Sequence, residues 1–236
     1  MHIRISELNP ETKTPQIILF NKIKTKSLAW NVSKATNVSE ARALLEKMVK
    51  ACLGDDGVGL AAPQINIFKQ LFIIREMDTD NKPLESFIGY FNPEWKAVSE
   101  DGKETGIEGC LSVPGLPYEV SRWKTIDATW WELQEDGSFV ERKERFTGYK
   151  AMIFQHENAH LRARSIVDDG KPAGEEDKLI VEDKKKQKLI NTGANLKNKA
   201  VKVSGGASGA RPKSGGVCPP IGFNGIFSGP PPSGAT

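Results

Sequence analysis

The first strong hydrophobic pattern lies between residues 39 and 54. Apolar side chains recur there at helical spacing, which predicts one buried helix face. Ser39 precedes the pattern as a typical N-cap residue, and Gly54 follows it as a typical helix end. We therefore expect a helix over residues 39–54. Its apolar positions are Ala41, Leu44, Leu45, Met48 and Cys52.

Strand patterns follow this helix. Residues 71–75 form an apolar run that predicts a buried strand, and residues 78–83 have the composition of a turn. A second strand is expected over residues 87–91, where Asn92 and Pro93 would end it.

A hairpin and a second helix complete the patterned part of the chain. Residues 126–133 alternate between apolar and polar, residues 135–137 (Glu-Asp-Gly) form a turn, and residues 139–146 return as the partner strand. Residues 149–164 then predict a long helix. This order of elements predicts an α+β fold with antiparallel sheets.

Composition changes after residue 170. Residues 1–170 have the patterns of a catalytic domain, residues 171–203 a charged extension with a marginal helix at 175–191, and residues 204–236 a Gly/Pro/Ser-rich tail that we expect to be disordered. The whole chain has a net charge of +3. Nine basic and no acidic residues lie from Lys184 onward, so residues 1–183 carry about −6.

Cysteine usage and hydropathy bear on the compartment. The chain has three Cys residues, which cannot all pair, and this favours a reducing interior. No apolar run approaches the roughly 20 residues of a membrane span, and the first residues lack the apolar stretch of a signal peptide. We expect a cytoplasmic protein without membrane contact.

Three segments carry candidate chemistry. The sequence His156-Glu157-Asn158-Ala159-His160 places two imidazoles at i and i+4, on one face of a helix, where they can bind one metal ion. Glu157 lies about 100° around that helix, within reach of a water on the metal. Cys110, within the sequence Glu-Gly-Cys-Leu-Ser at 108–112, offers a thiolate as third ligand. Three protein ligands leave an open position, as in hydrolytic sites.

The third segment, residues 57–64 (Gly-Val-Gly-Leu-Ala-Ala-Pro-Gln), is too rich in Gly for a helix and too apolar for an ordinary loop. Taken in order, residues 57–64, 108–112 and 155–161 resemble the three signature segments of the peptide deformylases. That family removes the formyl group from the N-terminal methionine of new bacterial and organellar proteins. The resemblance implies antiparallel β-sheets packed around a central metal-binding helix.

Two positions depart from the family pattern. Ala159 stands where family members usually carry Asp, and Ala163 stands where Gly is often found. Neither is a ligand. Loss of a carboxylate behind the ligands would weaken metal binding or ligand orientation more than it would change the mechanism.

The resemblance implies a role for each matched residue. Cys110, His156 and His160 would bind one divalent ion, Fe²⁺ in the cell or Zn²⁺. Glu157 would act as general acid and base, and the side chain of Gln64 and the backbone N–H of Leu111 would stabilise the oxyanion.

The implied substrates are N-formylmethionyl nascent peptides. Residues 57–60, including Gly57 and Gly59, would pair with the substrate backbone as an added strand. The methionine pocket implied by the resemblance is formed by Val58, Tyr149, Met152 and Ile153, together with the ring of His156. The nine basic residues after Asp183 suit either a solvated tail or contact with the ribosome, whose surface is dense in phosphate.

Two other functions remain open at this point. An HExxH metallopeptidase would take its third ligand from downstream, where Glu175 or Glu176 has a suitable spacing. A catalytically silent relative could instead bind ribosomal RNA or an acidic partner through its basic tail, and Ala159 is the residue that supports this alternative.

Overall fold

The computed structural model of the protein describes residues 1–32 and 38–174. It contains two antiparallel β-sheets and few helices, which confirms the predicted mixture of helix and antiparallel sheet. The larger sheet has six strands in the order β2-β3-β4-β7-β8, with β1 paired to β4, and the smaller has the order β5-β6-β9. The marginal helix expected at 175–191 and the tail from 204 lie outside the described residues.

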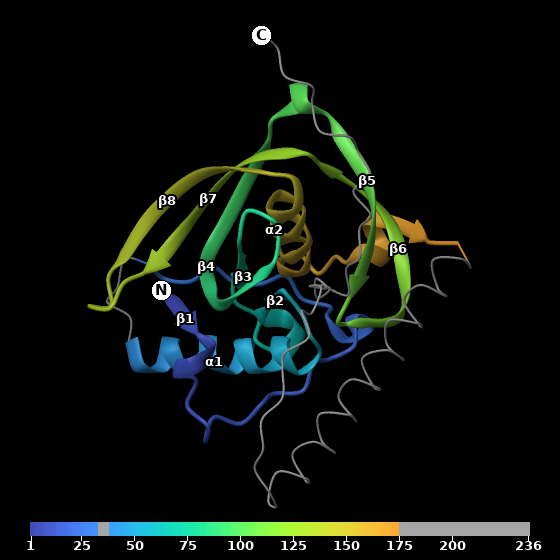
Figure 1. Cartoon of the computed structure of the whole chain (residues 1–236). Helices are drawn as coiled ribbons and strands as arrows, with labels where there is room; N and C mark the ends of the chain where they lie inside the picture. Colours follow the sequence, from blue (N-terminus) through green and yellow to red (C-terminus); the bar gives the residue numbers. More distant parts are fainter. Residues whose placement is uncertain (33–37, 175–236) are drawn as a thin grey trace, which may run out of the picture.

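Figure 1 shows the arrangement of these elements. The strands are β1 (His2–Arg4), β2 (Gly59–Ala61), β3 (Leu71–Met77), β4 (Pro83–Ala97), β5 (Lys103–Cys110), β6 (Val113–Trp123), β7 (Thr125–Leu133), β8 (Phe139–Thr147) and β9 (Gly170–Pro172). The helices are α1 (Val38–Gly54), α2 (Gly148–Leu161) and α3 (Ile166–Asp169), with short 3-10 turns η1 (Ile5–Glu7), η2 (Phe20–Lys22), η3 (Ala62–Ile65) and η4 (Ser99–Asp101).

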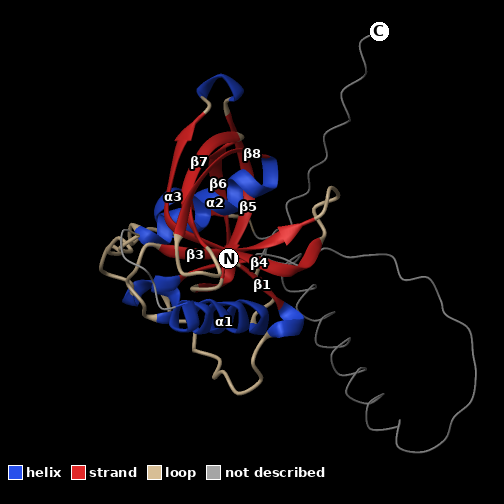
Figure 2. Cartoon of the chain, turned by 90° about the vertical axis from the view of Figure 1, so that its left-hand side faces the viewer, coloured by secondary structure: helices blue, strands red, loops and turns tan. Residues whose placement is uncertain are grey.

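The two long helices pack on opposite faces of the larger sheet, as Figures 1 and 2 both show. Successive side chains of a strand point to opposite faces, and β3 follows this rule. Leu71 and Ile73 belong to the core with α1, whereas Phe72 and Ile74 belong to the core with α2. The apolar run predicted as one buried strand is therefore buried on both faces, and α2 lies between the two sheets.

Helix α1 and the hairpin agree closely with the sequence patterns. The helix begins at Val38, so Ser39 lies inside it rather than at its N-cap. The hairpin pairs β7 with β8 from Thr125 opposite Thr147 to Leu133 opposite Phe139. The periodic patterns thus gave both elements to within one residue at each end.

The prediction that Asn92 and Pro93 end a strand was wrong. Strand β4 continues to Ala97, and its pairing with β7 shifts register between Phe91 and Glu94. Such a bulge tolerates Pro, because the extra residue makes no ladder hydrogen bond. Asn92 adopts a left-handed conformation with φ of 45°. Its side-chain amide forms two hydrogen bonds with the backbone of Trp30, which stabilise the bulge.

Helix α2 ends at Leu161, three residues before the predicted end. The N–H of Arg164 donates to the carbonyl of Ala159, and the N–H of Ala163 donates to the carbonyl of His160. This pair of bonds is the Schellman motif, which needs a left-handed residue just after the helix. Ala163 occupies that position with φ of 56°. The position often held by Gly in the family is therefore a helix terminus.

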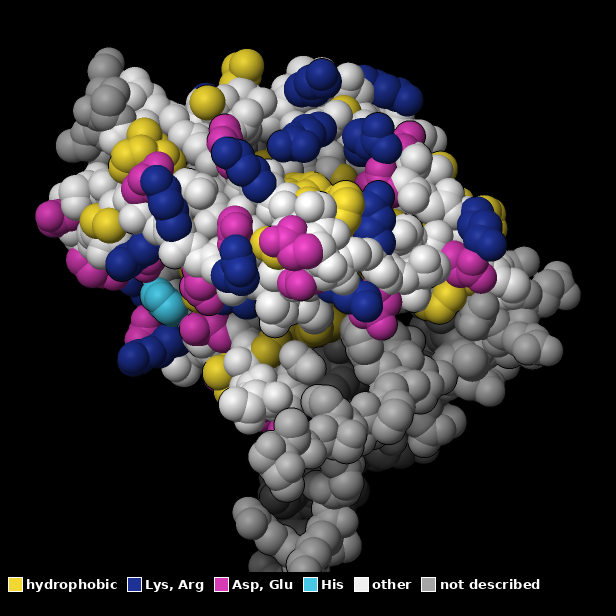
Figure 3. All heavy atoms as spheres, turned by 90° about the horizontal axis from the view of Figure 1, so that it is seen from above, with side chains coloured by type: hydrophobic (Ala, Val, Ile, Leu, Met, Phe, Trp, Pro, Cys, Tyr) yellow, Lys and Arg dark blue, Asp and Glu magenta, His cyan; other side chains and the backbone are white. Residues whose placement is uncertain are grey.

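Strand β8 forms one edge of the larger sheet, and the short strand β2 forms the other. Residues 140–145 of β8 are all exposed. On the face of the molecule shown in Figure 3, acidic and basic side chains are interspersed. Among the described residues no helix is long and apolar enough to cross a membrane.

Candidate metal centre

Three buried donor side chains meet at one point. Cys110, His156 and His160 each offer one ligand atom, and these atoms lie within 4.8 Å of one another. Helix α2 supplies the two His residues from adjacent turns, with their rings 5.1 Å apart. Strand β5 supplies Cys110, whose Sγ lies 3.3 Å from Nε2 of His160. The three candidate ligands predicted from sequence are therefore brought together.

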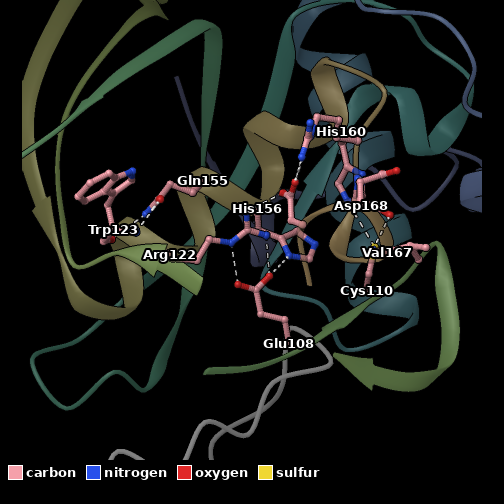
Figure 4. A network of polar contacts seen from close by, with 12 residues as sticks. Glu108, Cys110, Arg122, Trp123, Gln155, His156, His160, Val167 and Asp168 are labelled. Carbon is pink, nitrogen blue, oxygen red and sulfur yellow. Dashed lines mark hydrogen bonds and ion pairs between the residues drawn. The ribbon is translucent and has the colours of Figure 1, made fainter. Parts of the chain in front are cut away.

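Glu108, two residues before Cys110 on β5, holds the ring of His156. Its carboxylate lies 2.8 Å from Nδ1, so the other ring nitrogen, Nε2, is left for a ligand. Figure 4 shows Glu108 between His156 and Arg122 of β6. Both carboxylate oxygens accept hydrogen bonds from Arg122, at 2.8 and 2.9 Å. A carboxylate or carbonyl that fixes the second nitrogen is typical of metal-binding His residues.

The charges around Glu108 explain its ionisation. Burial alone would raise the pKa of Glu108, but hydrogen bonds from Arg122 and His156 outweigh burial and hold that pKa at about 2. Burial lowers the pKa of His156, whereas hydrogen bonds with Cys110 and Glu108 raise it to about 10. A proton and a cation therefore compete for the same position on His156. Burial and the positive neighbours His156 and Arg122 keep the pKa of His160 well below its usual value.

Glu157 lies beside these donors with a free carboxylate oxygen. It is 1% exposed, and among the described residues its Oε2 has no hydrogen-bond partner. Burial raises the pKa of Glu157 to about 7. The positive charge of His156 lowers this pKa and the negative charge of Glu108 raises it, so the two neighbours act in opposite directions. A carboxylate that titrates near neutrality can both accept and donate a proton under cellular conditions.

Gln64 in η3 points its amide nitrogen at the donors. Its Oε1 accepts the backbone N–H of Ala61 at 2.8 Å, which fixes the orientation of the amide. Its Nε2 therefore faces Ser112 Oγ at 3.2 Å and Cys110 Sγ at 3.9 Å. The segment before α1 also reaches this region, since the N–H of Ile18 donates to the carbonyl of Gln64.

The predicted pocket residues also lie together. Val58, Met152 and Ile153 are buried in the same apolar cluster, and Tyr149 packs against it. Gly59 lies against Glu157, because a Cβ on this Gly would be 2.5 Å from Oε1. Gly57 has a similar restriction, since a Cβ there would be 2.8 Å from a side-chain carbon of Leu111. At either position a Cβ would therefore force neighbouring side chains to move.

Several residues of the site had no role in the sequence prediction. Gln155 accepts the N–H of Trp123 and donates to its carbonyl, which ties α2 to β6. Glu108 and Gln155 lie inside the matched segments, so the sequence could have indicated that they belong to the site. Arg122 lies outside the segments, and only the fold shows that it contacts Glu108. Ala159 is partly exposed, and the structure shows its carbonyl capping the end of α2.

Comparisons with known proteins agree with this geometry. Residues 17–176 match the model of the polypeptide deformylase family. The chain belongs to this family. A peptide deformylase of Thermotoga neapolitana is 40% identical over 131 residues, which are 55% of this chain and 71% of that protein. Similar proteins in sequence and structure are thus peptide deformylases, a family of hydrolases.

Solved structures of deformylases share the fold. A probable peptide deformylase from Synechococcus phage S-SSM7 matches with a TM-score of 0.57 and 30% identity, over 66% of this chain and 99% of that one. The deformylase of Acinetobacter baumannii bound to Met-Ala-Ser matches with a TM-score of 0.57 and 26% identity, over 67% of this chain and 99% of that one. Both matches cover nearly the whole of the solved chain, so this chain shares the fold over almost their full length.

Proposed function

We propose that this protein hydrolyses the N-formyl group of N-terminal formylmethionine on nascent polypeptides and releases formate. The observation that carries the proposal is the buried cluster of Cys110, His156 and His160 beside Glu157, whose Oε2 has no hydrogen-bond partner in the described part of the chain. One thiolate and two imidazoles suit a divalent transition metal, and three protein ligands leave a position open. The Nδ1 of His156 is already held by Glu108, which fits a ligand that binds through Nε2.

A bound divalent ion supplies Lewis acidity that activates a water molecule near neutral pH. Glu157 accepts a proton from that water as the water oxygen attacks the formyl carbon. The same carboxyl group then delivers the proton to the amine as the C–N bond breaks. Formic acid, which ionises to formate in water, and a peptide with a free N-terminal amine leave, and Glu157 is again ionised. A pKa near 7 suits both transfers.

The oxyanion of this reaction would be stabilised by two donors of the chain. Gln64 supports such a role, because its oxygen is occupied by Ala61 and its NH₂ group is turned toward Cys110. Leu111 follows Cys110 directly, so its backbone N–H is the second candidate. Removal of one such donor typically raises the barrier by about 3 kcal/mol.

The substrate would bind as an added strand along residues 57–60 at the β2 edge of the larger sheet, and its methionine side chain would enter the cluster of Val58, Tyr149, Met152 and Ile153. The A. baumannii relative binds Met-Ala-Ser, a peptide that begins with methionine. Backbone hydrogen bonds to the substrate do not depend on its side chains after the first residue, which suits an enzyme that acts on many proteins.

We further propose Fe²⁺ as the metal in the cell, with Zn²⁺ as an alternative, because affinity favours zinc whereas cellular supply can favour iron. Residues 1–170 would form the catalytic domain, residues 171–203 an extension and residues 204–236 a tail. A cytoplasmic location and contact of the extension with ribosomes belong to the same proposal. The metallopeptidase alternative depends on Glu175 or Glu176, which lie outside the described residues.

The test is turnover of a short formyl-Met peptide under anaerobic conditions, with metal content measured on the same sample. We expect formate release by the wild-type protein, and loss of both metal and turnover in Cys110→Ser. A metallopeptidase with a downstream Glu ligand would keep its metal in Cys110→Ser and lose it in Glu175→Gln or Glu176→Gln. Wild-type protein that binds metal but releases no formate would indicate a silent relative.

A further inference from the structure

The ion pairs around Glu108 extend beyond the three signature segments to Asp169 at the end of α3. Arg122 uses Nε and Nη2 for Glu108 and donates from Nη1 to Asp169 at 2.9 Å. Asp169 also accepts two hydrogen bonds from Arg164, at 3.0 and 2.5 Å. A chain of charges of alternating sign therefore runs from Arg164 through Asp169, Arg122 and Glu108 to His156.

Burial decides which members of this chain are rigid. The side chain of Glu108 is 0% exposed, that of Arg122 10% and that of Asp169 15%, whereas that of Arg164 is 55% exposed. Interactions between buried charges are screened little by solvent. The guanidinium of Arg122 is planar and carries its donors in a fixed fork. Because carboxylates hold it on two sides, it has one orientation, and it fixes both oxygens of Glu108.

We propose that Asp169 is a positioning residue for the metal ligand His156, acting through Arg122 and Glu108. The inference rests on the metal site of the proposed function. Without the carboxylate of Asp169, Arg122 would retain Glu108 on one side only and could rotate toward solvent. Glu108 would then hold the imidazole less firmly. Partners behind the ligands typically change metal affinity 10–100-fold when they are removed.

The chain offers a matched control in the adjacent residue. Asp168 belongs to the same short helix and has the same side chain, but it accepts the backbone N–H of Ser165 in the capping box of α3. Asp168→Asn therefore weakens α3 without touching Arg122. Arg164→Gln is a second control, because it removes the exposed partner of Asp169 and leaves the contact with Arg122 in place.

The experiment measures Zn²⁺ dissociation constants of the purified full-length variants by competition with a chelator, and hydrogen exchange of the His156 Nδ1–H by NMR in the zinc-loaded protein. We expect Asp169→Asn to bind Zn²⁺ about 10-fold more weakly than wild type and to exchange this proton faster. Asp168→Asn and Arg164→Gln should resemble wild type in both measurements.

Two results would overturn the proposal. One is Zn²⁺ affinity in Asp169→Asn within twofold of wild type, and the other is an equal loss in Asp168→Asn, which would show damage to α3 alone. If Asp169→Asn does not fold, Arg122→Lys tests the same relay, because it keeps the charge and removes the fork; unchanged affinity there would also overturn it. Retention of zinc by the Cys110→Ser variant would instead refute the proposed metal site.

Discussion

Glu157 shows how one side chain can depend on its surroundings for its chemistry. Its neighbours in sequence predicted a metal motif, but its pKa near 7 comes mainly from burial under β2, with His156 lowering it and Glu108 of β5 raising it. The identity and spacing of the three candidate ligands were predictable, because i and i+4 on a helix are adjacent by geometry. Arg122 and Asp169 were not predictable. Arg122 reaches Glu108 across the pair of strands β5 and β6, and Asp169 of α3 reaches Arg122 from a part of the chain 47 residues further on.

We expect Glu157→Ala to fold, to bind metal and to lose at least about 10²-fold in kcat, because a group that transfers the proton has been removed while the ligands remain. The measurement is formate release from a formyl-Met peptide, with metal content determined on the same preparation. A variant that retains more than about a tenth of the wild-type rate would refute the assigned role.

The free energy of unfolding at low pH should depend on the ion pairs of Glu108. Its pKa in the folded protein is about 2, against an ordinary value of 4.5. A lowered carboxyl pKa stabilises the fold above the unfolded value, and this contribution is lost as pH falls through the folded value. Between pH 5 and pH 2 the free energy of unfolding of wild type should fall by roughly 3 kcal/mol more than that of Glu108→Gln.

The comparison is made by urea unfolding of both proteins in metal-free form. Other carboxyl groups titrate in the same range, but they are common to the two proteins and cancel in the difference. Parallel pH profiles for wild type and Glu108→Gln would mean that the ion pairs of Glu108 contribute nothing to acid stability.

At the scale of elements, helices and the hairpin follow from local periodicity, whereas their irregularities follow from distant contacts. Asn92 and Pro93 looked like a strand end because Pro cannot donate in a ladder. The bulge removes that requirement, and Trp30, more than 60 residues away, supplies hydrogen bonds that stabilise it. The end of α2 was missed for a different reason. Ala163 rather than Gly stands at the left-handed position, so the usual stop signal is absent.

Ala163→Gly should therefore stabilise the protein. A left-handed conformation costs an L-residue about 1–2 kcal/mol, and the greater freedom of unfolded Gly offsets roughly half of that. We expect the free energy of unfolding to rise by roughly 0.5–1 kcal/mol, seen as a higher urea midpoint at unchanged slope. Ala159→Gly, in the last turn of α2, is the control and should lower stability by up to about 1 kcal/mol. Equal effects of the two changes would contradict this account.

The contact between β2 and α2 has its own test. Gly59→Ala should reduce kcat/KM by about 10²-fold, because its Cβ would displace the carboxylate of Glu157 by an ångström or so. The metal ligands are untouched, so metal content should not change. Gly106→Ala is the matched control, since a Cβ there meets nothing within 4 Å. If both variants keep the wild-type rate, the close packing of Gly59 does not position Glu157.

At the scale of the whole molecule, charge is divided between the body and the extension. Residues 1–183 carry about −6, and the nine basic residues follow. A chain truncated after Asp183 should lose salt-dependent co-sedimentation with ribosomes, because basic side chains release counterions when they bind phosphate. Its kinetics on a short formyl-Met peptide should be unchanged. Equal sedimentation of full-length and truncated protein at low salt would exclude docking by this segment.

The charged β8 strand has a consequence for a protein that meets unfolded chains. A nascent polypeptide exposes backbone donors and acceptors that can pair with any open strand edge, and such pairing is a common start of aggregation. Along β8, a visiting strand would have to desolvate charged side chains on the way in; these are Glu141, Arg142, Lys143, Glu144 and Arg145. The two edges of the larger sheet thus differ in how readily they would pair with another chain: the β2 edge is the proposed place where a substrate peptide would bind for one turnover, and the charged β8 edge would discourage the same peptide from staying.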